Sequence, residues 1–184
     1  MGMIYSIGYG NRSWHTTLGL LKRFECEFLV DVRSNPHSKF NPDYNREALQ
    51  ALCAAERIRY LFMGDVLGGK PTGKDCFDDE GKVDYIRLAE TRSFQSGVAR
   101  LTLAFEKGLS LFILCSELKP EMCHRSKLIG AELIERGVGV GHVDEHGEVI
   151  TQSQAIDRIT GGQNDMFGNS PVATRSRGSY GTGR

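Results

Sequence analysis

Short apolar runs typical of buried strands alternate along this chain with stretches whose apolar residues recur at helical spacing. The strand-like runs cover residues 3–10, 26–34, 58–64, 109–116 and 138–143. The fourth run, LSLFILCS, is almost continuously apolar, as expected for a strand that is covered on both faces. This alternation predicts an α/β fold with a three-layer Rossmann-like architecture, in which helices cover both faces of a mostly parallel sheet.

Capping and stop signals place the helices between these runs. We expect Ser13, Asn45 and Ser93 to cap the first three helices, and Pro120 to lie in the first turn of the fourth. Gly108 and Gly137 are expected to end the third and fourth helices, and a short helix is expected near residues 152–159.

The domain organisation follows from length and composition. The 184 residues suit one domain, which we place at residues 1–160, with a Gly- and charge-rich loop insertion at about 64–92. Residues 161–184 have little apolar content and three arginines, and we predict a disordered tail whose arginines can contact phosphates. The 23 basic and 23 acidic residues cancel, so no global field indicates a nucleic-acid or membrane partner.

The cysteines and the start of the chain indicate a cellular setting. The five cysteines are an odd number, and MGMIYSIGYG lacks the basic and long apolar regions of a signal peptide. No stretch approaches the roughly 18 apolar residues of a membrane span. We therefore expect free thiols in the cytoplasm and no membrane partner.

Polar residues follow the first two strand-like runs, where ligands gather in parallel sheets. Gly8, Tyr9 and Asn11 form a turn before a helix, so their amides are candidates for anion binding, the alternative being a plain tight turn. The second run ends in DVRS, residues 31–34. Arg33 and Ser34 are candidate anion ligands, and Asp31 is a candidate general base or orienting group. The alternative is a structural Asp–Arg pair.

The fourth run leads into CSELKPEMCHRS, residues 115–126, and three interpretations stay open. Cys123 can be a nucleophile or redox thiol favoured by a helix start and its basic neighbours, with Cys115 as its resolving partner. Alternatively, both cysteines can hold zinc with a His or Asp, although the spacing is not CxxC and we predict no metal. Finally, the thiols can be passive while His124, Arg125 and Ser126 bind an anion. No GxGxxG fingerprint is present, so no nicotinamide cofactor is predicted.

Several of these segments resemble one known family. IYSIGYGNRS, LVDVRSNPHS and LCSELKPEMCHRS are similar, in this order, to motifs of the domain-of-unknown-function 488 family. The resemblance implies an α/β fold, a cytoplasmic location in bacteria or archaea, and a link to nucleotide or nucleic-acid processing. The chain carries Tyr9 where many members carry a histidine, which argues against proton transfer at that position because a tyrosine pKa is near 10.

A weaker resemblance is to rhodanese-type sulfurtransferases, which also have a DVR strand end and a cysteine loop leading to Arg-Ser at a helix start. Asp31 and Arg33, followed by Cys115 and then Arg125 and Ser126, repeat that order. The segment from Cys115 to Arg125 is much longer than a rhodanese loop, so a tight cradle of amides around the sulfur is not implied.

Three functional hypotheses result. The first is an enzyme acting on a phosphate-bearing small molecule or nucleic acid. In it, Arg33, Arg125 and the Gly8–Asn11 turn hold the anion, while Asp31, Glu117, His124 or Cys123 supplies the acid, base or nucleophile. The second is a thiol sulfurtransferase that uses Cys115 or Cys123. The third is a non-catalytic nucleic-acid-binding or sensing module.

Overall fold

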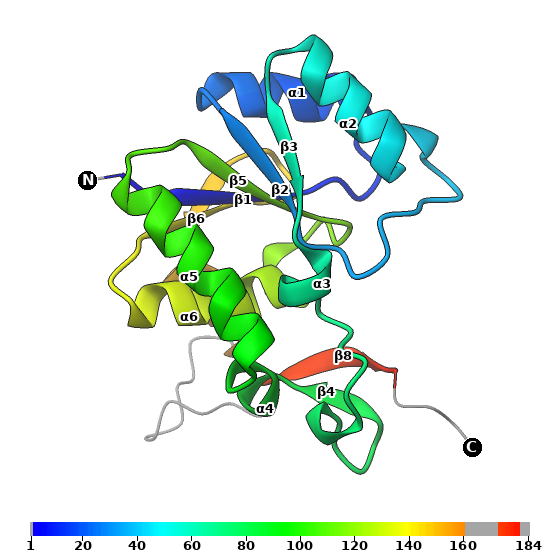
Figure 1. Cartoon of the computed structure of the whole chain (residues 1–184), viewed down its shortest axis with the longest axis vertical. Helices are drawn as coiled ribbons and strands as arrows, with labels where there is room; N and C mark the ends of the chain where they lie inside the picture. The colour runs from blue at the N-terminus through cyan, green and yellow to red at the C-terminus, as the bar shows by residue number, and fades with distance from the viewer. Residues whose placement is uncertain (1, 161–172, 181–184) are drawn as a thin grey trace.

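A computed structural model describes residues 2–160 and 173–180 of the chain. Six strands of this part form one sheet in the order β3-β2-β5-β1-β6-β7 (Figure 1). Their bounds are β1 Ile4–Gly8, β2 Phe28–Asp31, β3 Arg59–Phe62, β5 Leu111–Cys115, β6 Val140–Val143 and β7 Val149–Thr151. The first five are parallel, and β7 pairs antiparallel with β6 at the edge. The predicted α/β fold with a mostly parallel sheet is therefore confirmed.

The helices cover both faces of the sheet. Their bounds are α1 Trp14–Arg23, α2 Arg46–Ala55, α3 Gly64–Leu67, α4 Tyr85–Ala89, α5 Arg92–Glu106, α6 Ala131–Glu135 and α7 Gln152–Thr160. Figure 1 shows α1 and α2 on one face, and α5 and α6 on the other. Each face has its own apolar core, with Phe112 of β5 contributing to the first and Ile113 of the same strand to the second. This double burial explains why the β5 segment is apolar throughout. No helix among the described residues is long and apolar enough to cross a membrane.

The predicted cap positions are confirmed for Ser13 and Asn45 and corrected for Ser93. Ser13 caps α1, and its hydroxyl oxygen accepts a hydrogen bond from the Thr16 amide at 3.2 Å. Asn45 occupies the N-cap position of α2, but its side chain accepts from the Ser38 amide instead. Thr91, not Ser93, caps α5, because the helix begins at Arg92.

Residues 64–92, expected to be a loop with at most one short helix, contain more regular structure than that. The segment forms α3, a 3-10 turn at Lys74–Cys76, the short strand β4 at Lys82–Asp84, and α4. Asp84 ends β4 and caps α4, accepting from the amides of Ile86 and Arg87. These elements are too short for a hydrophobic period to be visible in the sequence.

The prediction of a disordered tail from residue 161 is wrong for residues 175–179. Arg175–Ser179 form strand β8, which pairs antiparallel with β4. Ser176 is 4% exposed, and its hydroxyl accepts from the Val83 amide at 2.9 Å. The Tyr180 amide donates to the Gly81 carbonyl at 2.7 Å. Backbone pairing and hydroxyl contacts hold this strand, so its sequence RSRGS needs no apolar pattern. Residues 161–172 and 181–184 lie outside the described part.

A network of buried polar side chains links β1, β6 and α7. His142, in the middle of β6, accepts from the Ser6 hydroxyl at Nδ1 (2.6 Å) and donates from Nε2 to the Gln152 side-chain oxygen (2.6 Å). The Gln152 amide group donates onward to the Ser126 carbonyl at 2.9 Å, which leaves the Gln152 oxygen as the acceptor for histidine. Burial lowers the pKa of His142 from 6.5 to about 4. The imidazole is therefore neutral in the folded protein near neutral pH.

This lowered pKa predicts a specific loss of stability in acid. The unfolded chain takes up the His142 proton near pH 6.5, whereas the folded protein does so only near pH 4. The contribution is complete above pH 6.5 and is lost as the pH falls toward 4, and it amounts to about 3 kcal/mol. His142→Gln should therefore flatten the decline of the unfolding free energy across this window in urea titrations. The matched variant at exposed His146, His146→Gln, should keep the decline. An equal decline in wild type and His142→Gln would contradict the prediction.

Candidate functional site

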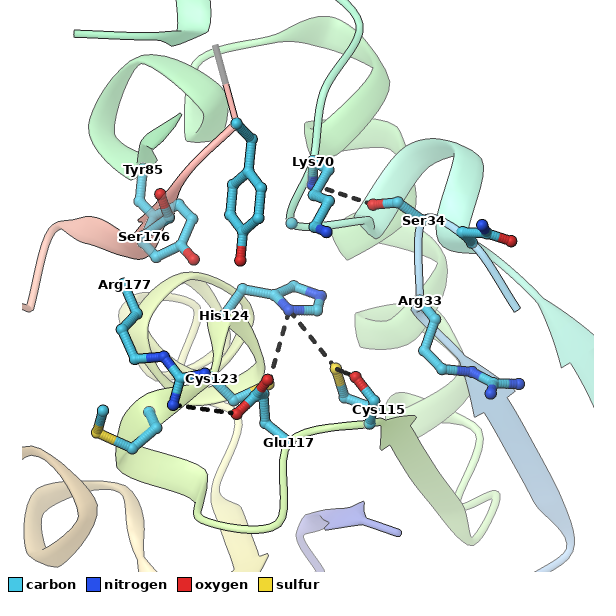
Figure 2. Close-up of a pocket in the computed structure, with 15 residues that line it drawn as sticks. Arg33, Ser34, Lys70, Tyr85, Cys115, Glu117, Cys123, His124, Ser176 and Arg177 are labelled. Atoms are coloured by element: carbon cyan, nitrogen blue, oxygen red, sulfur yellow. Dashed lines mark hydrogen bonds and ion pairs between the residues drawn. The ribbon is translucent and has the colours of Figure 1, made fainter. Parts of the chain in front are cut away.

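A cavity of about 170 Å³ opens where β2 and β5 end (Figure 2). Its walls come from segments far apart in the sequence. These are residues 33–35 after β2, 69–70 after α3, Tyr85, 115–117 after β5, 122–124, and Ser176, Arg177 and Tyr180 at β8. The carboxyl ends of β2 and β5 lie side by side because these strands are neighbours in the sheet. The site therefore lies at the edge of the sheet where the strand-end rule places it.

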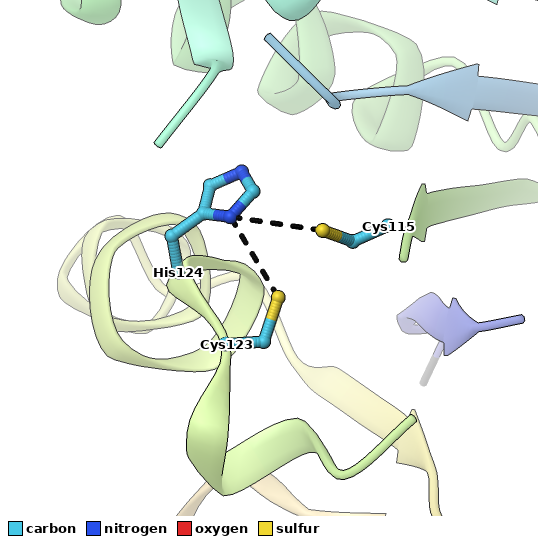
Figure 3. Close-up of side chains that lie close together, drawn as sticks. All are labelled: Cys115, Cys123 and His124. Atoms are coloured by element: carbon cyan, nitrogen blue, oxygen red, sulfur yellow. Dashed lines mark hydrogen bonds between the residues drawn. The ribbon is translucent and has the colours of Figure 1, made fainter. Parts of the chain in front are cut away.

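Two thiols and an imidazole meet in the wall of this cavity (Figure 3). Cys115 is the last residue of β5, Cys123 follows the 3-10 turn Pro120–Met122, and His124 precedes the π-helical turn Arg125–Gly130. His124 Nδ1 lies 3.8 Å from the Cys115 sulfur and 3.6 Å from the Cys123 sulfur. His124 Nε2 lies 3.3 Å from the Val32 carbonyl oxygen. That carbonyl can only accept, so Nε2 carries a proton and Nδ1 is the nitrogen that faces the thiols.

The two thiols have pKa values that diverge. The pKa of Cys115 lies well below its ordinary value, because the Cys123 thiol donates a hydrogen bond to it and the charges of His124 and Arg125 favour the thiolate against the opposing effect of burial. The pKa of Cys123 is raised well above its ordinary value by burial and by its hydrogen bond to Cys115. The surroundings thus favour ionisation of Cys115 over ionisation of Cys123. All five cysteines are buried and free of disulfides.

Arg125, predicted to bind an anion, does not face the cavity. Its guanidinium is fully buried and donates to the carbonyl oxygens of Glu117 and, at 2.9 Å, Leu118. Ser126, predicted beside it, donates its hydroxyl proton to the Pro120 carbonyl at 2.6 Å and is also fully buried. Both residues hold the segment between Cys115 and Cys123 in place, so anion binding is assigned to neither.

Asp31 and Arg33 form a structural pair, which was the alternative to a functional role. The Arg33 guanidinium donates to both Asp31 carboxylate oxygens, at 2.8 and 2.6 Å, and the Tyr60 hydroxyl donates to the same carboxylate at 2.7 Å. Asp31 is fully buried and does not line the cavity. Arg33 lines it, but its guanidinium is directed away from Cys115 in Figure 2. The Asp31 carboxylate is thus occupied by its donors and does not reach the cavity.

The Gly8–Asn11 turn also lies outside the cavity. The amides of Tyr9 and Gly10 donate to the carbonyl oxygens of Cys115 and Ser116, at 3.1 and 2.9 Å, so they are not available to an anion. The Tyr9 ring stacks on Tyr44, with ring centroids 3.9 Å apart. Asn11 is exposed. The turn anchors the loop that follows β5.

Ser34 and Glu117 do line the cavity, as do several residues that sequence reasoning missed. The Ser34 hydroxyl accepts from the Lys70 amide at 3.0 Å, and Glu117 forms an ion pair with Arg177 at 3.8 Å. The missed residues are Lys70, Tyr85, Ser176, Arg177 and Tyr180. Lys70 follows the glycine pair Gly68–Gly69, which was the one available signal for it.

Fold and site together define a three-layer α/β protein with a Cys–Cys–His cluster at the carboxyl edge of its sheet. The chain matches the family described as "Domain of unknown function DUF488" over residues 13–131, and it belongs to that family. The match includes DVRS and the whole segment from Cys115 to Ser126, whereas β1 and β8 lie outside it. A comparison with curated proteins finds no match, and a comparison with solved structures finds none.

Gly8→Ala should strongly destabilise the protein. A Cβ atom at Gly8 would lie 1.7 Å from the Glu117 carbonyl oxygen and 2.3 Å from the Arg125 guanidinium. The backbone of the segment between Cys115 and Cys123 would therefore have to move. We expect a loss of about 3 kcal/mol in urea unfolding. Gly19→Ala is the matched control, because it lies exposed in α1 with open space around it and should gain about 1 kcal/mol. Equal stabilities of the two variants would contradict this account.

Gly69→Ala should change thiol reactivity through His124. Its Cβ would lie 2.7 Å from His124 Cγ and 2.9 Å from Nδ1, so the ring must leave its present position beside the sulfurs. We expect the pH profile of Cys115 alkylation by iodoacetamide, followed by peptide mass spectrometry, to move to higher pH. Gly73→Ala is the control, because its Cβ meets nothing within 4 Å. An unchanged profile in Gly69→Ala would show that His124 does not tune the thiol.

Proposed function

We propose that this chain is a thiol-dependent sulfur-transfer enzyme with Cys115 as its nucleophile. The observation that carries the proposal is the convergence of Cys115, Cys123 and His124 at the cavity wall. A thiolate is the reactive form of cysteine, and the neighbours of Cys115 lower its pKa and so favour that form. The Cys123 proton and the His124 ring are in place to stabilise charge on the sulfur.

The cavity supports a small anionic donor such as thiosulfate. About 170 Å³ is below the roughly 300–1,000 Å³ of pockets that bury drug-sized ligands, so it suits a few heavy atoms. Lys70 and Arg177 contribute the positive charges of the wall outside the buried Arg33. Lys70 stacks on the Tyr180 ring, with its nitrogen 4.1 Å from the centroid, and Arg177 pairs with Glu117. Both cations can attract a donor anion toward Cys115.

The reaction balances as two displacements. The Cys115 thiolate attacks the outer sulfur of thiosulfate, the sulfur–sulfur bond of the donor breaks, and sulfite leaves with the bonding electron pair. Cys115 then carries a persulfide with the negative charge on its terminal sulfur. In the second step an acceptor nucleophile, such as cyanide or a thiol, attacks that terminal sulfur, and the bonding pair returns to Cys115 as thiolate.

An enzyme for a phosphate-bearing substrate is the second candidate at the same cavity. Its support is the pair Lys70 and Arg177 together with the Ser34 hydroxyl, rather than Arg33, Arg125 and the Gly8–Asn11 turn. The size of the cavity favours inorganic phosphate or a terminal phosphoryl group over burial of a whole nucleotide.

Incubation of the reduced protein with thiosulfate should add the mass of one sulfur atom to Cys115. Cys115→Ser should abolish the adduct. Cys123→Ala should slow its formation at neutral pH, because the hydrogen bond that favours the thiolate is lost, and higher pH should restore the rate. Cys26→Ser is the control, since that thiol lies away from the cavity and donates to the Phe28 carbonyl, which serine can also do. No persulfide on Cys115 in intact-protein and peptide mass spectra would exclude sulfur transfer and favour the phosphate candidate.

A further inference from the structure

We infer that Cys115, Cys123 and His124 form a binding site for zinc, with a fourth coordination position open to the cavity. The two sulfurs and Nδ1 all lie within 4.8 Å of one another, and the two sulfur–nitrogen distances are 3.8 and 3.6 Å. In a tetrahedral zinc site, with bonds of about 2.3 Å to sulfur and 2.0–2.1 Å to nitrogen, neighbouring ligand atoms lie about 3.5–3.8 Å apart. The three side chains thus need only small shifts to enclose the ion.

The histidine has the second partner that metal-binding histidines require. Its Nε2 faces the Val32 carbonyl at 3.3 Å, which keeps the proton on Nε2 and turns the Nδ1 lone pair toward the sulfurs. Gly69 packs against the same ring, so a larger residue there would displace it. The ring is therefore held in the ligating orientation by β2 on one side and by the segment after α3 on the other.

The donor set selects the class of ion. Thiolate and imidazole ligands suit zinc, whereas magnesium and calcium take oxygen ligands. Three protein ligands with one position open are typical of catalytic zinc sites, in contrast to the four ligands of structural sites. Cys115, Cys123 and His124 all line the cavity, so a water molecule or a substrate atom can complete the coordination from that side.

Zinc binding and sulfur transfer exclude each other, because both thiolates are occupied in the metal-bound form. The site itself rests on geometry alone, whereas this control of reactivity rests on the proposed sulfur transfer. Zinc would then act as a switch that keeps Cys115 unreactive until the ion is removed.

Cobalt titration of the full-length, reduced and chelator-treated protein tests the site. We expect one Co²⁺ per chain, with thiolate-to-cobalt charge-transfer absorption and the intense visible bands of tetrahedral cobalt, both removed by added Zn²⁺. Cys115→Ser, Cys123→Ser and His124→Ala should each weaken cobalt binding more than about 100-fold. Loss of a residue that only supports a ligand costs up to about 100-fold, and loss of the ligand itself should cost more. Cys26→Ser and His146→Gln should bind as wild type does. Circular dichroism and urea unfolding identify any variant that fails to fold. For such a variant, the decisive measurement is the charge-transfer absorption of the wild type and its loss on alkylation of Cys115 and Cys123.

Absence of charge-transfer absorption in the wild type, or its persistence in all three folded ligand variants, would overturn the inference. Thiosulfate incubation of the zinc-loaded protein separates the two proposals. Persulfide formation that zinc suppresses and a chelator restores supports both. Cobalt binding without any persulfide in the metal-free protein leaves the metal site standing and excludes sulfur transfer. A persulfide without cobalt binding supports sulfur transfer and excludes the metal site.

Discussion

The buried guanidinium of Arg125 is the contact on which the site depends. It binds the carbonyl oxygens of Glu117 and Leu118, and the Glu117 carbonyl lies against Gly8, where the chain has no room for a Cβ atom. The amides of Tyr9 and Gly10 hold the same loop from the other side through Cys115 and Ser116. These contacts fix the conformation of the segment between Cys115 and Cys123. The Cys123 sulfur therefore lies close to the Cys115 sulfur, although seven residues separate them in the sequence.

The order of strands then brings in the third member of the cluster. Since β2 and β5 are neighbours, the Val32 carbonyl after β2 lies beside the end of β5, where it accepts from His124. The Asp31–Arg33 pair lies at the same strand end, and it directs the Arg33 guanidinium away from the thiols and toward Tyr9. The sheet thus supplies a backbone acceptor to the cluster, while its charged side chains stabilise the interior.

These relations show what the sequence could and could not predict. The continuous apolar run before Cys115 identified the central strand, and the strand-end rule led to Cys115, Cys123 and His124. The sequence could not decide whether the guanidinium groups of Arg33 and Arg125 bind a ligand, because a guanidinium near a strand end binds a neighbouring carboxylate or backbone carbonyls as readily. In the structure they make those internal contacts. Strand β8 and the cavity residues Ser176 and Arg177 were missed. Their strand is held by backbone pairing with β4, which leaves no apolar period to read.

The charge balance of the cavity links its two proposed uses. The guanidinium of Arg125, a buried cation whose charge favours the Cys115 thiolate, already donates to two carbonyl oxygens. A second thiolate in this dry setting needs a new positive charge beside it. An incoming zinc ion brings that charge to the sulfurs themselves, whereas an anionic donor brings more negative charge and must rely on Lys70 and Arg177 in the cavity wall. The same three side chains can therefore bind a cation or serve the attack on an anion, and these two uses differ in where the compensating positive charge lies: on the sulfurs themselves or in the cavity wall.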